Sequence, residues 1–388
     1  MSLKFVGIIG SGLIGTDPFD SCSWSGSSRF FFNTCIRYGI LKRAFGVEVE
    51  KYRRFKMMLR HFSLDVPLWK HKFYLDVKYY DALTREISKQ LKLSDFSCNM
   101  LQLGGIYDVP GIMKGKTKCY SYHDGNLAEM LRSPYMPKNI PRAMIDKALN
   151  FEKIVYKNMT TIFTMSEYLR HSFIYDFGIK ESRVKNIGAG INLDKIPPIM
   201  EKSYDNQEVL FIGVDFIRKG GFQLLEAFHH LKQSLPRAKL HIIGPDPKPL
   251  DIDTKFLKGV EFHGNLSKQK SDERNVFEDT IARCSLFVMP SLYEPFGIAP
   301  LEGMVYQIPC ILTNRWAFPE MVQEGFNGNL VPCNDIEALY EAMKSMLRNP
   351  DLLRKMGESA RSFVLENYTW DIVVKRLIKE TETNNNGL

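Results

Sequence analysis

The sequence has no long apolar run and no cysteine motif, and these two absences limit what the chain can be. No stretch of about 18 consecutive apolar residues occurs, so a membrane-spanning helix is not expected. The seven cysteines are scattered and odd in number, without a C-x-x-C pair, which favours reduced thiols, a cytoplasmic location and no structural zinc. The short apolar start lacks a small-x-small cleavage pattern and predicts a strand rather than a signal peptide.

Short apolar runs alternate with amphipathic stretches along the 388 residues, which is typical of parallel strands joined by helices. We therefore expect an α/β protein with two Rossmann-like domains, residues 1–198 and 199–367, that face each other across a cleft. The polar stretch 194–207, with its Pro-Pro pair, predicts the linker. A helix over about 368–388 is expected to pack back on the first domain. Strands are expected at 4–9, 99–103, 118–122, 161–165, 184–187, 209–213, 240–245, 260–264, 286–290 and 308–312.

The first glycines form a G-x-G-x-x-G motif, with Gly10, Gly12 and Gly15, directly after the first expected strand. A dinucleotide site also needs a helix that starts within the motif and an acidic residue about 20 positions later. Here the motif is followed by turn residues at 16–21, and no carboxylate closes a second strand near residue 35. The context excludes a nicotinamide or flavin site, and these glycines are expected to let the chain turn.

The stretch "MPSLYEPFGIAPLEGM", residues 289–304, carries the most informative chemistry. A buried strand is expected to end at Pro290, and helical sequence begins near Gly297, between two carboxylates spaced E-x7-E, Glu294 and Glu302. The free amides of a helix N-terminus form an anion site, and glycine lets a ligand approach the backbone closely. We expect Glu294 at the mouth of the site and Glu302 two helical turns further on.

A second stretch, "VLFIGVDFIRKGGFQLLEAF", places two cations, Arg218 and Lys219, just before an expected helix. Positive charge at a helix N-terminus opposes the macrodipole unless an anion lies nearby. A diphosphate would supply that anion. The plain alternative is a solvated loop with two charged side chains.

With both stretches in view, the chain resembles a retaining glycosyltransferase of the GT-B fold, of the "glycosyl transferases group 1" or family 4 type. The resemblance covers nearly the whole chain and is carried by residues 294–302 and by 218–228. It implies that Glu294 is catalytic at the donor sugar, that Glu302 binds the ribose, and that Lys219 with Arg218 neutralises the diphosphate. One departure is that Val214-Asp215 follow Gly213, where many relatives have arginine.

The resemblance also assigns the remaining site residues. Gly26, in "SCSWSGSSRFFF", resembles the family's glycine loop at the donor diphosphate, and His123 resembles the histidine at the donor sugar. Gly297 and Ile298 complete the expected diphosphate site. The nucleobase region is expected around Gly244, His263 and Leu266.

The implied reaction moves a sugar from a nucleoside diphosphate sugar, with a UDP-sugar favoured, to an acceptor hydroxyl with retention at the anomeric carbon. The acceptor would belong to polysaccharide, glycolipid or cell-envelope glycan synthesis. A nucleotide-sugar epimerase or hydrolase of the same fold, and a non-catalytic sugar-nucleotide binding protein, are the alternatives. No cofactor and no metal are expected, because the one D-x-D pair, Asp251-x-Asp253, lies in a proline-rich loop.

Much of the net charge of +8 lies in residues 42–78, where basic residues alternate with aromatic and apolar ones. This segment predicts contact with an anionic acceptor or with an anionic membrane that carries a lipid-linked one. A solvated basic face over a packed helix explains the same pattern. We expect no nucleic-acid partner, and a cytoplasmic protein that is either free or peripheral at the inner face of the membrane.

Overall fold

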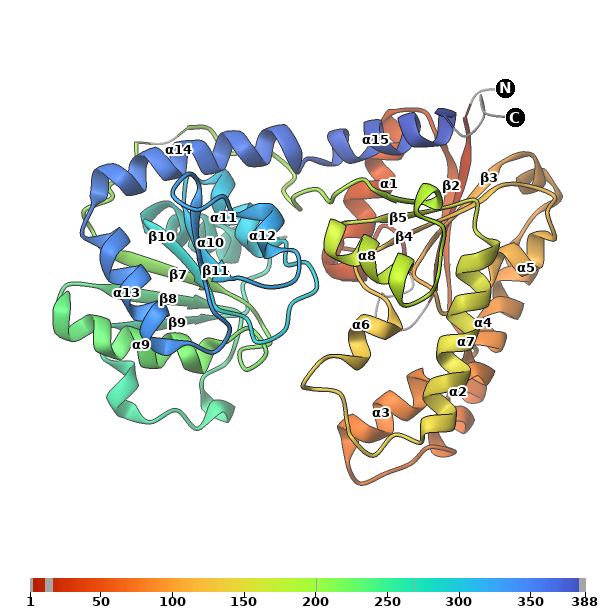
Figure 1. Cartoon of the computed structure of the whole chain (residues 1–388), viewed down its shortest axis with the longest axis horizontal. Helices are drawn as coiled ribbons and strands as arrows, with labels where there is room; N and C mark the ends of the chain where they lie inside the picture. Colours follow the sequence, from red (N-terminus) through yellow and green to blue (C-terminus); the bar gives the residue numbers. More distant parts are fainter. Residues whose placement is uncertain (1–2, 11–16, 200, 269, 384–388) are drawn as a thin grey trace. The chain divides into compact units, whose positions relative to one another are not determined.

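The computed structural model of the chain describes residues 3–10, 17–199, 201–268 and 270–383. It divides into two compact units (Figure 1). The N-terminal unit contains Met1–Asn192 and Trp370–Leu388, and the C-terminal unit contains Leu193–Thr369. In the described parts of the chain, no helix is both long enough and apolar enough to cross a membrane.

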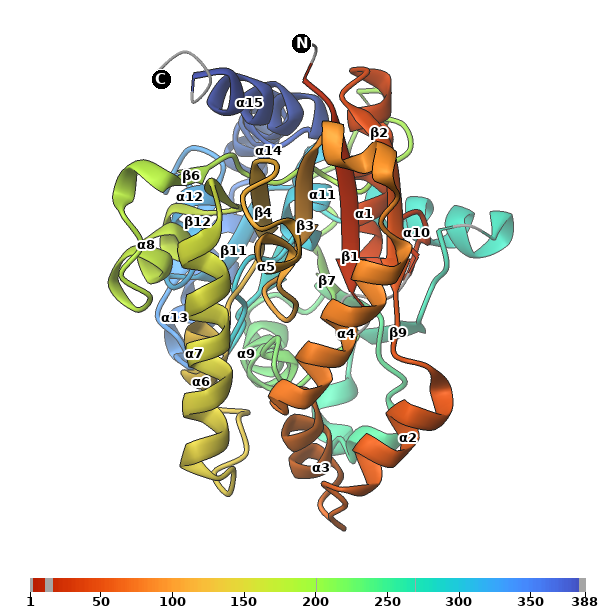
Figure 2. The same cartoon turned by 90° about the vertical axis from the view of Figure 1, so that its right-hand side faces the viewer.

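The N-terminal unit is built on a six-stranded parallel sheet with the order β2-β1-β3-β4-β5-β6 (Figure 2). Helices cover both faces, so the central strands are buried, and this explains why they appear as continuous apolar runs in the sequence. The strands are β1 (Phe5–Gly10), β2 (Leu41–Val47), β3 (Asn99–Leu103), β4 (Cys119–His123), β5 (Thr161–Thr164) and β6 (Val184–Asn186).

The helices of this unit start at recognisable N-caps. The side chains of Asp65, Asp76, Asp108, Asn126 and Ser166 each accept a hydrogen bond from a backbone N–H of the helix that follows. The helices are α1 (Ser27–Arg37), α2 (Lys51–Leu59), α3 (Val66–Tyr74), α4 (Val77–Gln90), α5 (Val109–Met113), α6 (Leu127–Leu131), α7 (Arg142–Asn158), α8 (Glu167–Tyr175) and α15 (Trp370–Thr383).

Strand β2 is absent from the set of strands that the sequence predicts, where residues 42–78 are a single basic segment. The alternation of buried and exposed residues in β2 is hard to see in the sequence. Because β2 is an edge strand, it has Lys42 and Arg43 at positions that reach solvent. Their side chains lie along the edge: Lys42 donates to the Ser94 carbonyl at 2.6 Å, and Arg43 pairs with Asp95. Two of the basic residues therefore hold the sheet edge, and only the rest of the segment forms helices.

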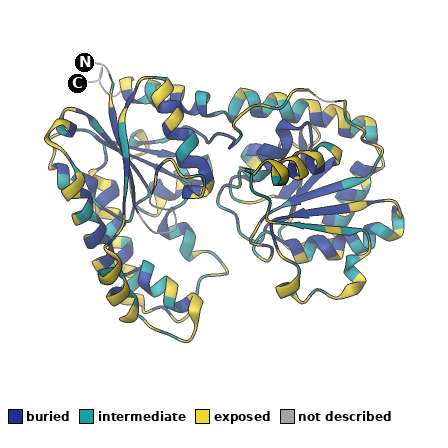
Figure 3. Ribbon diagram, turned by 180° about the vertical axis from the view of Figure 1, so that it is seen from behind, coloured by how far each residue is buried: buried dark blue, intermediate teal, exposed yellow. Residues whose placement is uncertain are grey.

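The C-terminal unit also has a six-stranded parallel sheet, with the order β12-β11-β10-β7-β8-β9. The strands are β7 (Glu208–Ile212), β8 (Lys239–Ile243), β9 (Val260–Gly264), β10 (Leu286–Met289), β11 (Cys310–Thr313) and β12 (Gly328–Val331). Its helices are α9 (Gly221–Ser234), α10 (Ser271–Arg283), α11 (Ala299–Val305), α12 (Phe318–Met321), α13 (Ile336–Leu347) and α14 (Pro350–Asn367). Figure 3 shows the buried strands at the centre and exposed residues on the outer helices.

The prediction of an α/β protein with two Rossmann-like halves is confirmed. The sequence prediction missed β12, which is only four residues long and starts at a glycine. The last helix, α15, packs on α1 within the N-terminal unit: the Trp370 ring lies 5.8 Å from the Phe31 ring, and its Nε1 donates to Asn192 at 3.2 Å. A Cβ on Gly190 would fall 2.4 Å from the Trp370 ring, so this glycine makes room for the tryptophan.

Candidate active site

The charged residues singled out in the C-terminal unit lie at the carboxyl edge of its sheet. From β7 the chain proceeds outward to β8 and β9, then returns to form β10 on the other side of β7. The loops after β7 and β10 therefore leave the sheet next to each other, at the point where the strand order reverses. In open α/β sheets ligands bind at this point.

Three charged side chains from these two loops meet in one cluster. Glu294 follows β10, and one of its oxygens, Oε2, lies 3.0 Å from the Lys219 Nζ and 3.3 Å from an Arg218 guanidinium nitrogen. The Glu294 side chain is 11% exposed and that of Lys219 15%. Burial alone would raise the pKa of Glu294, but the two cations outweigh it, and the net direction of the pKa is downward. Glu294 is therefore a carboxylate at neutral pH.

This cluster shows which anion the two cations face. The sequence argument required an anion beside Arg218 and Lys219 and proposed a diphosphate. In the structure the carboxylate of Glu294 supplies that negative charge. The requirement is thus met within the chain, and a diphosphate would have to share the cations with Glu294.

Arg218 and Lys219 differ in how far their donors are already used. Arg218 also pairs with Asp215 at 2.9 Å and donates to the Tyr293 carbonyl at 2.8 Å, so it ties the β7 loop to the β10 loop. The Lys219 ammonium, with three N–H donors, contacts Glu294 and the Met289 sulfur at 3.6 Å. Lys219 is therefore the better placed of the two to accept a new anionic partner.

Two glycines allow the loops to approach so closely. Gly220, the N-cap of α9, has φ +76°, and a Cβ there would lie 2.0 Å from the Pro290 carbonyl oxygen. Gly297 has φ +79°, and a Cβ there would lie 2.9 Å from the Phe318 ring and 3.1 Å from the Glu294 side chain. Only glycine adopts this backbone conformation without strain, so both positions are fixed by the loop contacts.

Glu302 lies elsewhere on the same edge and has a different partner. Helix α11 begins at Ala299, with Ile298 as its N-cap, so Glu302 is in the first turn and not two turns into the helix. Its carboxylate is 8% exposed on the side chain and pairs with Lys268 Nζ at 2.6 Å. The sequence analysis did not identify Lys268, because the two residues are 34 positions apart and residue 268 stands in a loop without periodicity.

The expected nucleobase residues follow the ends of β8 and β9. Gly244 has φ +127° and donates its N–H to the Gly264 carbonyl, and a Cβ on it would fall 2.6 Å from the Gly213 backbone. Leu266 is half-buried in the loop after β9. The His263 ring contacts a second histidine, and its Nε2 is 3.1 Å from Nδ1 of His241.

In the N-terminal unit the glycine loop has an unusual backbone. Trp24, Ser25 and Gly26 have φ of 49°, 54° and 85°, three consecutive residues in the left-handed region. Asn192 holds this turn by donating to the Ser25 carbonyl and to Ser27 Oγ, both at 3.0 Å. Such strain is typical of functional loops. Gly26 then serves as the N-cap of α1 without a side-chain cap, so amides of the first turn remain available.

His123 ends β4 and is almost fully buried. Its ring lies 5.3 Å from the Tyr156 ring and 5.0 Å from the Phe173 ring, and within the described residues neither ring nitrogen has a hydrogen-bond partner. Burial lowers its pKa to about 3, so the imidazole is neutral at pH 7. The next residue, Asp124, accepts a hydrogen bond from Trp24 Nε1 at 2.7 Å and links the β4 end to the glycine loop.

Two motifs that the sequence analysis set aside can be placed in part. Asp251 and Asp253 are exposed in a loop, and Asp253 pairs with Lys255 at 3.2 Å. Gly10 ends β1, and a Cβ there would lie 2.6 Å from the Tyr107 ring, which gives this glycine a packing role. Gly12 and Gly15 lie outside the described residues.

Comparisons with known proteins agree with this architecture. Residues 194–363 match the family model described as "Glycosyl transferases group 1". A sucrose-phosphate synthase from Thermosynechococcus elongatus superimposes with a TM-score of 0.72 at 15% identity, over 99% of this chain and 100% of that one. The HepE protein of Anabaena, in complex with UDP and glucose, gives a TM-score of 0.63 at 14% identity, over 98% and 99% of the two chains.

Curated relatives match over a smaller part of their length. An uncharacterized glycosyltransferase of Methanocaldococcus jannaschii is 27% identical over 237 residues, 61% of this chain and 63% of that protein. A phosphatidyl-myo-inositol mannosyltransferase of Mycobacterium leprae is 27% identical over 207 residues, 50% and 52% of the two chains. The chain thus spans less than two thirds of these relatives. The fold is GT-B, as the sequence predicts, and residues 194–363 match the model of the glycosyl transferases group 1 family.

Proposed function

We propose that the protein is a retaining glycosyltransferase that moves a sugar from a nucleoside diphosphate sugar to an acceptor hydroxyl in glycan or glycolipid synthesis. The observation that carries this proposal is the contact of Glu294 with Lys219 and Arg218 at the strand-order reversal of a group 1 domain. A buried carboxylate beside two cations suits a substrate with a polyhydroxylated sugar and an anionic leaving group. A UDP-sugar is favoured, since HepE has the same fold and was crystallised with UDP and glucose.

The chain's own residues divide the work of this reaction. Negative charge grows on the diphosphate as the glycosidic bond breaks, and Lys219, with amides near Gly297 and Ile298, stabilises it. Arg218 chiefly positions Glu294, because its guanidinium is already bound to Asp215 and to the Tyr293 carbonyl. Glu294 orients the donor sugar and offsets positive charge at its ring. Glu302, held by Lys268, binds the ribose hydroxyls.

The N-terminal residues keep the roles that the resemblance implies. Gly26 contributes backbone amides toward the diphosphate, and His123 contacts the donor sugar. Because burial keeps the pKa of His123 at about 3, the ring acts as a neutral hydrogen-bond donor or acceptor and brings no positive charge. Gly244, His263 and Leu266 remain the proposed nucleobase region. No metal is required at the diphosphate, and turnover is expected to survive excess chelator; complete loss that manganese restores would contradict this.

Ligand-dependent thermal stability is the direct test. The full chain is incubated with UDP-, GDP- and ADP-sugars. A bound donor increases the free energy of unfolding by RT ln(1 + [L]/Kd), so the Tm should rise. Lys219→Ala should lose the shift, whereas Lys255→Ala, on an exposed loop, should keep it. No shift with any donor would contradict the proposal. Release of free sugar or an epimer without acceptor would favour the hydrolase or epimerase alternative.

The acceptor side is proposed from the helices after β2. Within residues 51–66, large apolar side chains are exposed beside Arg53, Lys56 and Arg60: Tyr52, Phe55, Leu59, Phe62, Leu64 and Val66. Leu64 is 92% exposed. Exposed aromatic and basic residues together suit an anionic membrane surface, where each cation adds about 1 kcal/mol. The named substrate of the M. leprae relative, a phosphatidyl-inositol, is consistent with a lipid acceptor.

Vesicle co-sedimentation separates this surface from a merely solvated face. Binding to anionic but not neutral vesicles, weakened by salt and by Arg53→Glu, Arg54→Glu and Lys56→Glu together, is expected. The matched control reverses three lysines on the C-terminal unit, Lys248, Lys255 and Lys258. Absence of vesicle binding, with unchanged activity of the triple variant, would leave a solvated basic face.

A further inference from the structure

A second cluster of ionisable side chains lies at the β9 edge of the C-terminal sheet, apart from the Glu294 cluster. His241 stands on β8 and is completely buried, while Glu261 and His263 stand on the neighbouring strand β9. Glu208, on β7, reaches His241 from the other side. Four side chains from three adjacent strands therefore converge. Of these, only His263 has a place in the proposed transfer reaction, in the nucleobase region, and that role does not require its contact with His241.

The distances within this cluster match the edges of a metal coordination tetrahedron. Nδ1 of His241 lies 3.1 Å from Nε2 of His263 and 3.4 Å from Oε2 of Glu261. Zinc bonds of about 2.0–2.2 Å to nitrogen and oxygen imply ligand–ligand edges of about 3.3 Å. The ligand atoms of all three residues lie within 4.8 Å of one another. Glu261 is exposed, so rotation of its side chain can shorten the remaining edge.

Glu208 prepares His241 for such a bond. Its carboxylate is 3.1 Å from Nε2 of His241 and accepts a hydrogen bond from the N–H of that nitrogen. This contact fixes the tautomer, so Nδ1 presents its lone pair toward His263 and Glu261. A carboxylate behind a histidine is the usual support of a metal-binding imidazole, and it orients the ring and raises its basicity.

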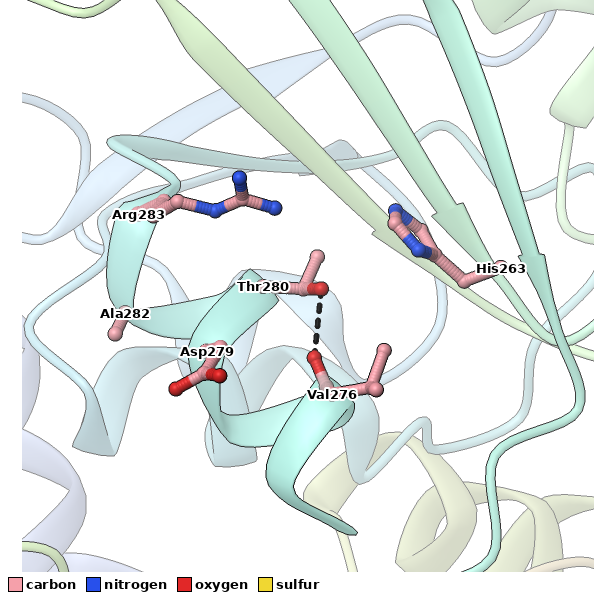
Figure 4. A pocket seen from close by; sticks show the side chains of 6 residues that line it. All are labelled: His263, Val276, Asp279, Thr280, Ala282 and Arg283. Atoms are coloured by element: carbon pink, nitrogen blue, oxygen red, sulfur yellow. Dashed lines mark hydrogen bonds between the residues drawn. The ribbon is translucent and has the colours of Figure 1, made fainter. Parts of the chain in front are cut away.

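His263 connects the cluster to a cavity on one face of the sheet. A cavity of about 460 Å³ opens between β9 and α10, bordered by His263, Thr280 and Arg283 (Figure 4). Figure 4 shows the His263 ring and the Arg283 side chain extending toward the same space. A metal held by the three side chains would thus keep one coordination position toward the cavity, where Arg283 favours water or an anion as the fourth ligand.

The charges around the cluster balance before any metal binds. Two carboxylates, Glu208 and Glu261, face two cations, Arg283 and Lys239, and Lys239 lies 3.8 Å from the other oxygen of Glu261. The nitrogen ligands favour Zn²⁺ over Mg²⁺ or Ca²⁺, which take oxygen ligands. A rival set on the opposite side of His241, with Glu208 and Cys284, is less suited because burial raises the pKa of the Cys284 thiol and disfavours the thiolate.

We propose that His241, Glu261 and His263 form a zinc-binding site that joins β8 to the edge strand β9, with a fourth position open to the cavity. Sequence analysis could not find it, because the expectation of no structural zinc rested on cysteine spacing, whereas these ligands meet only through strand pairing. Loss of the site should loosen β9, whose one neighbour among the described strands is β8.

Metal binding to the full chain tests the proposal without reference to activity. The protein is freed of metal with a chelator, dialysed and titrated with Zn²⁺ by calorimetry, and with Co²⁺ by visible absorption. We expect one Zn²⁺ per chain, an increase in Tm on binding, and the absorption of four-coordinate Co²⁺. His263→Ala and Glu261→Ala should weaken binding at least tenfold, and Glu208→Gln should weaken it about 10- to 100-fold.

Control variants keep the result specific. His229→Gln removes a histidine on α9 that contacts the Lys255 carbonyl, and it should bind Zn²⁺ like the unaltered chain. Cys284→Ser should also bind normally. Substoichiometric binding, equal affinity in His263→Ala and the unaltered chain, or a cobalt–thiolate band lost in Cys284→Ser would each overturn the proposal. Glu261 and His263 are not fully buried, so their variants are expected to fold, and circular dichroism confirms this before titration.

Discussion

The two units begin alike and diverge after their second strand. In the C-terminal unit β7, β8 and β9 follow one another outward, which gives the 3-2-1-4-5-6 order of dinucleotide-binding sheets. In the N-terminal unit the chain leaves β2, forms α2, α3 and α4, and returns to the other side of β1, which gives 2-1-3-4-5-6. Where the C-terminal unit has the third strand β9, the N-terminal unit therefore has the helices α2, α3 and α4.

The difference extends to the chemistry at the two strand-order reversals. Beside β7 the C-terminal unit concentrates charge in Lys219, Arg218 and Glu294. Beyond β1 and β4 the N-terminal unit has a left-handed turn, a Trp24–Asp124 hydrogen bond and a neutral His123. One unit thus gathers charged side chains at this place, and the other a left-handed turn and a buried neutral imidazole. The following changes test that division.

The largest effect is expected from Lys219→Ala in the C-terminal unit. Removal of one donor to a developing anion typically costs about 2.7–4 kcal/mol, or about 100- to 1,000-fold in kcat. Steady-state kinetics at saturating donor measures it, with Lys255→Ala as the exposed control. A kcat within a few fold of that of the unaltered enzyme would show that Lys219 does not stabilise the transition state.

The next largest effects are expected from substitutions of Glu302 and Glu294, which should separate donor binding from turnover. Glu302→Ala should chiefly raise KM for the donor, because a hydrogen bond to a charged group contributes about 1.5–3 kcal/mol equally in ground and transition states. Glu294→Ala should chiefly lower kcat. Kinetics with varied donor decides; the reverse pattern would exchange the two roles.

In the N-terminal unit His123 should make stability depend on pH. Its pKa is about 3 when folded and about 6.5 when unfolded, so between these values the unfolded chain binds the extra proton. Stability is therefore lost as pH falls from about 6.5, by up to about 1.4 kcal/mol per pH unit. Urea unfolding at pH 7 and pH 5 measures it.

Substitution isolates this contribution from the other carboxylates and histidines. His123→Phe should reduce the loss between pH 7 and pH 5, whereas His171→Gln, at an exposed position, should leave it unchanged. An equal loss in all three proteins would mean that the imidazole of His123 is protonated as readily in the folded chain as in the unfolded one.

The smallest effect is expected from Gly26→Ala. A left-handed residue with a Cβ costs about 1–2 kcal/mol, and Gly39→Ala, with φ +67° and no atom within 4 Å of its Cβ, should cost the same. At Gly26 the Cβ would also lie 3.2 Å from the Ser21 carbonyl, so only this variant should lower activity. Equal activity of the two variants would show that the turn has only a structural role.

The fold was largely predictable because buried parallel strands are mainly apolar on both faces. The runs that form β3, β4 and β5 lie between polar stretches, and the structure has strands at each, within one residue at either end. Strand β2 was missed because its lysine and arginine interrupt the apolar residues at a sheet edge, and β12 because its sequence GNLV has only two apolar side chains. Local sequence does not encode which edge a strand occupies.

The candidate site was predictable only where neighbours in the chain are also neighbours in space. Arg218 and Lys219 precede a helix, and Glu294 follows a strand, so their type and place were visible in the sequence. Their mutual contact was not, and neither was the pairing of Lys268 with Glu302. These contacts depend on strand order, since β7 and β10 are neighbours in the sheet although β8 and β9 lie between them in the chain.

Helix α15 gives the chain an order of completion during synthesis. The polypeptide passes through the whole C-terminal unit between Asn192 and Trp370, so the N-terminal unit receives its last helix only after the ribosome has made its partner. Until then the space that Gly190 leaves for the Trp370 indole is unfilled, and Asn192 lacks the hydrogen bond that Trp370 Nε1 donates to it. A chain that ends before Trp370 would therefore contain every strand and helix of the C-terminal unit but lack the last helix of the N-terminal unit.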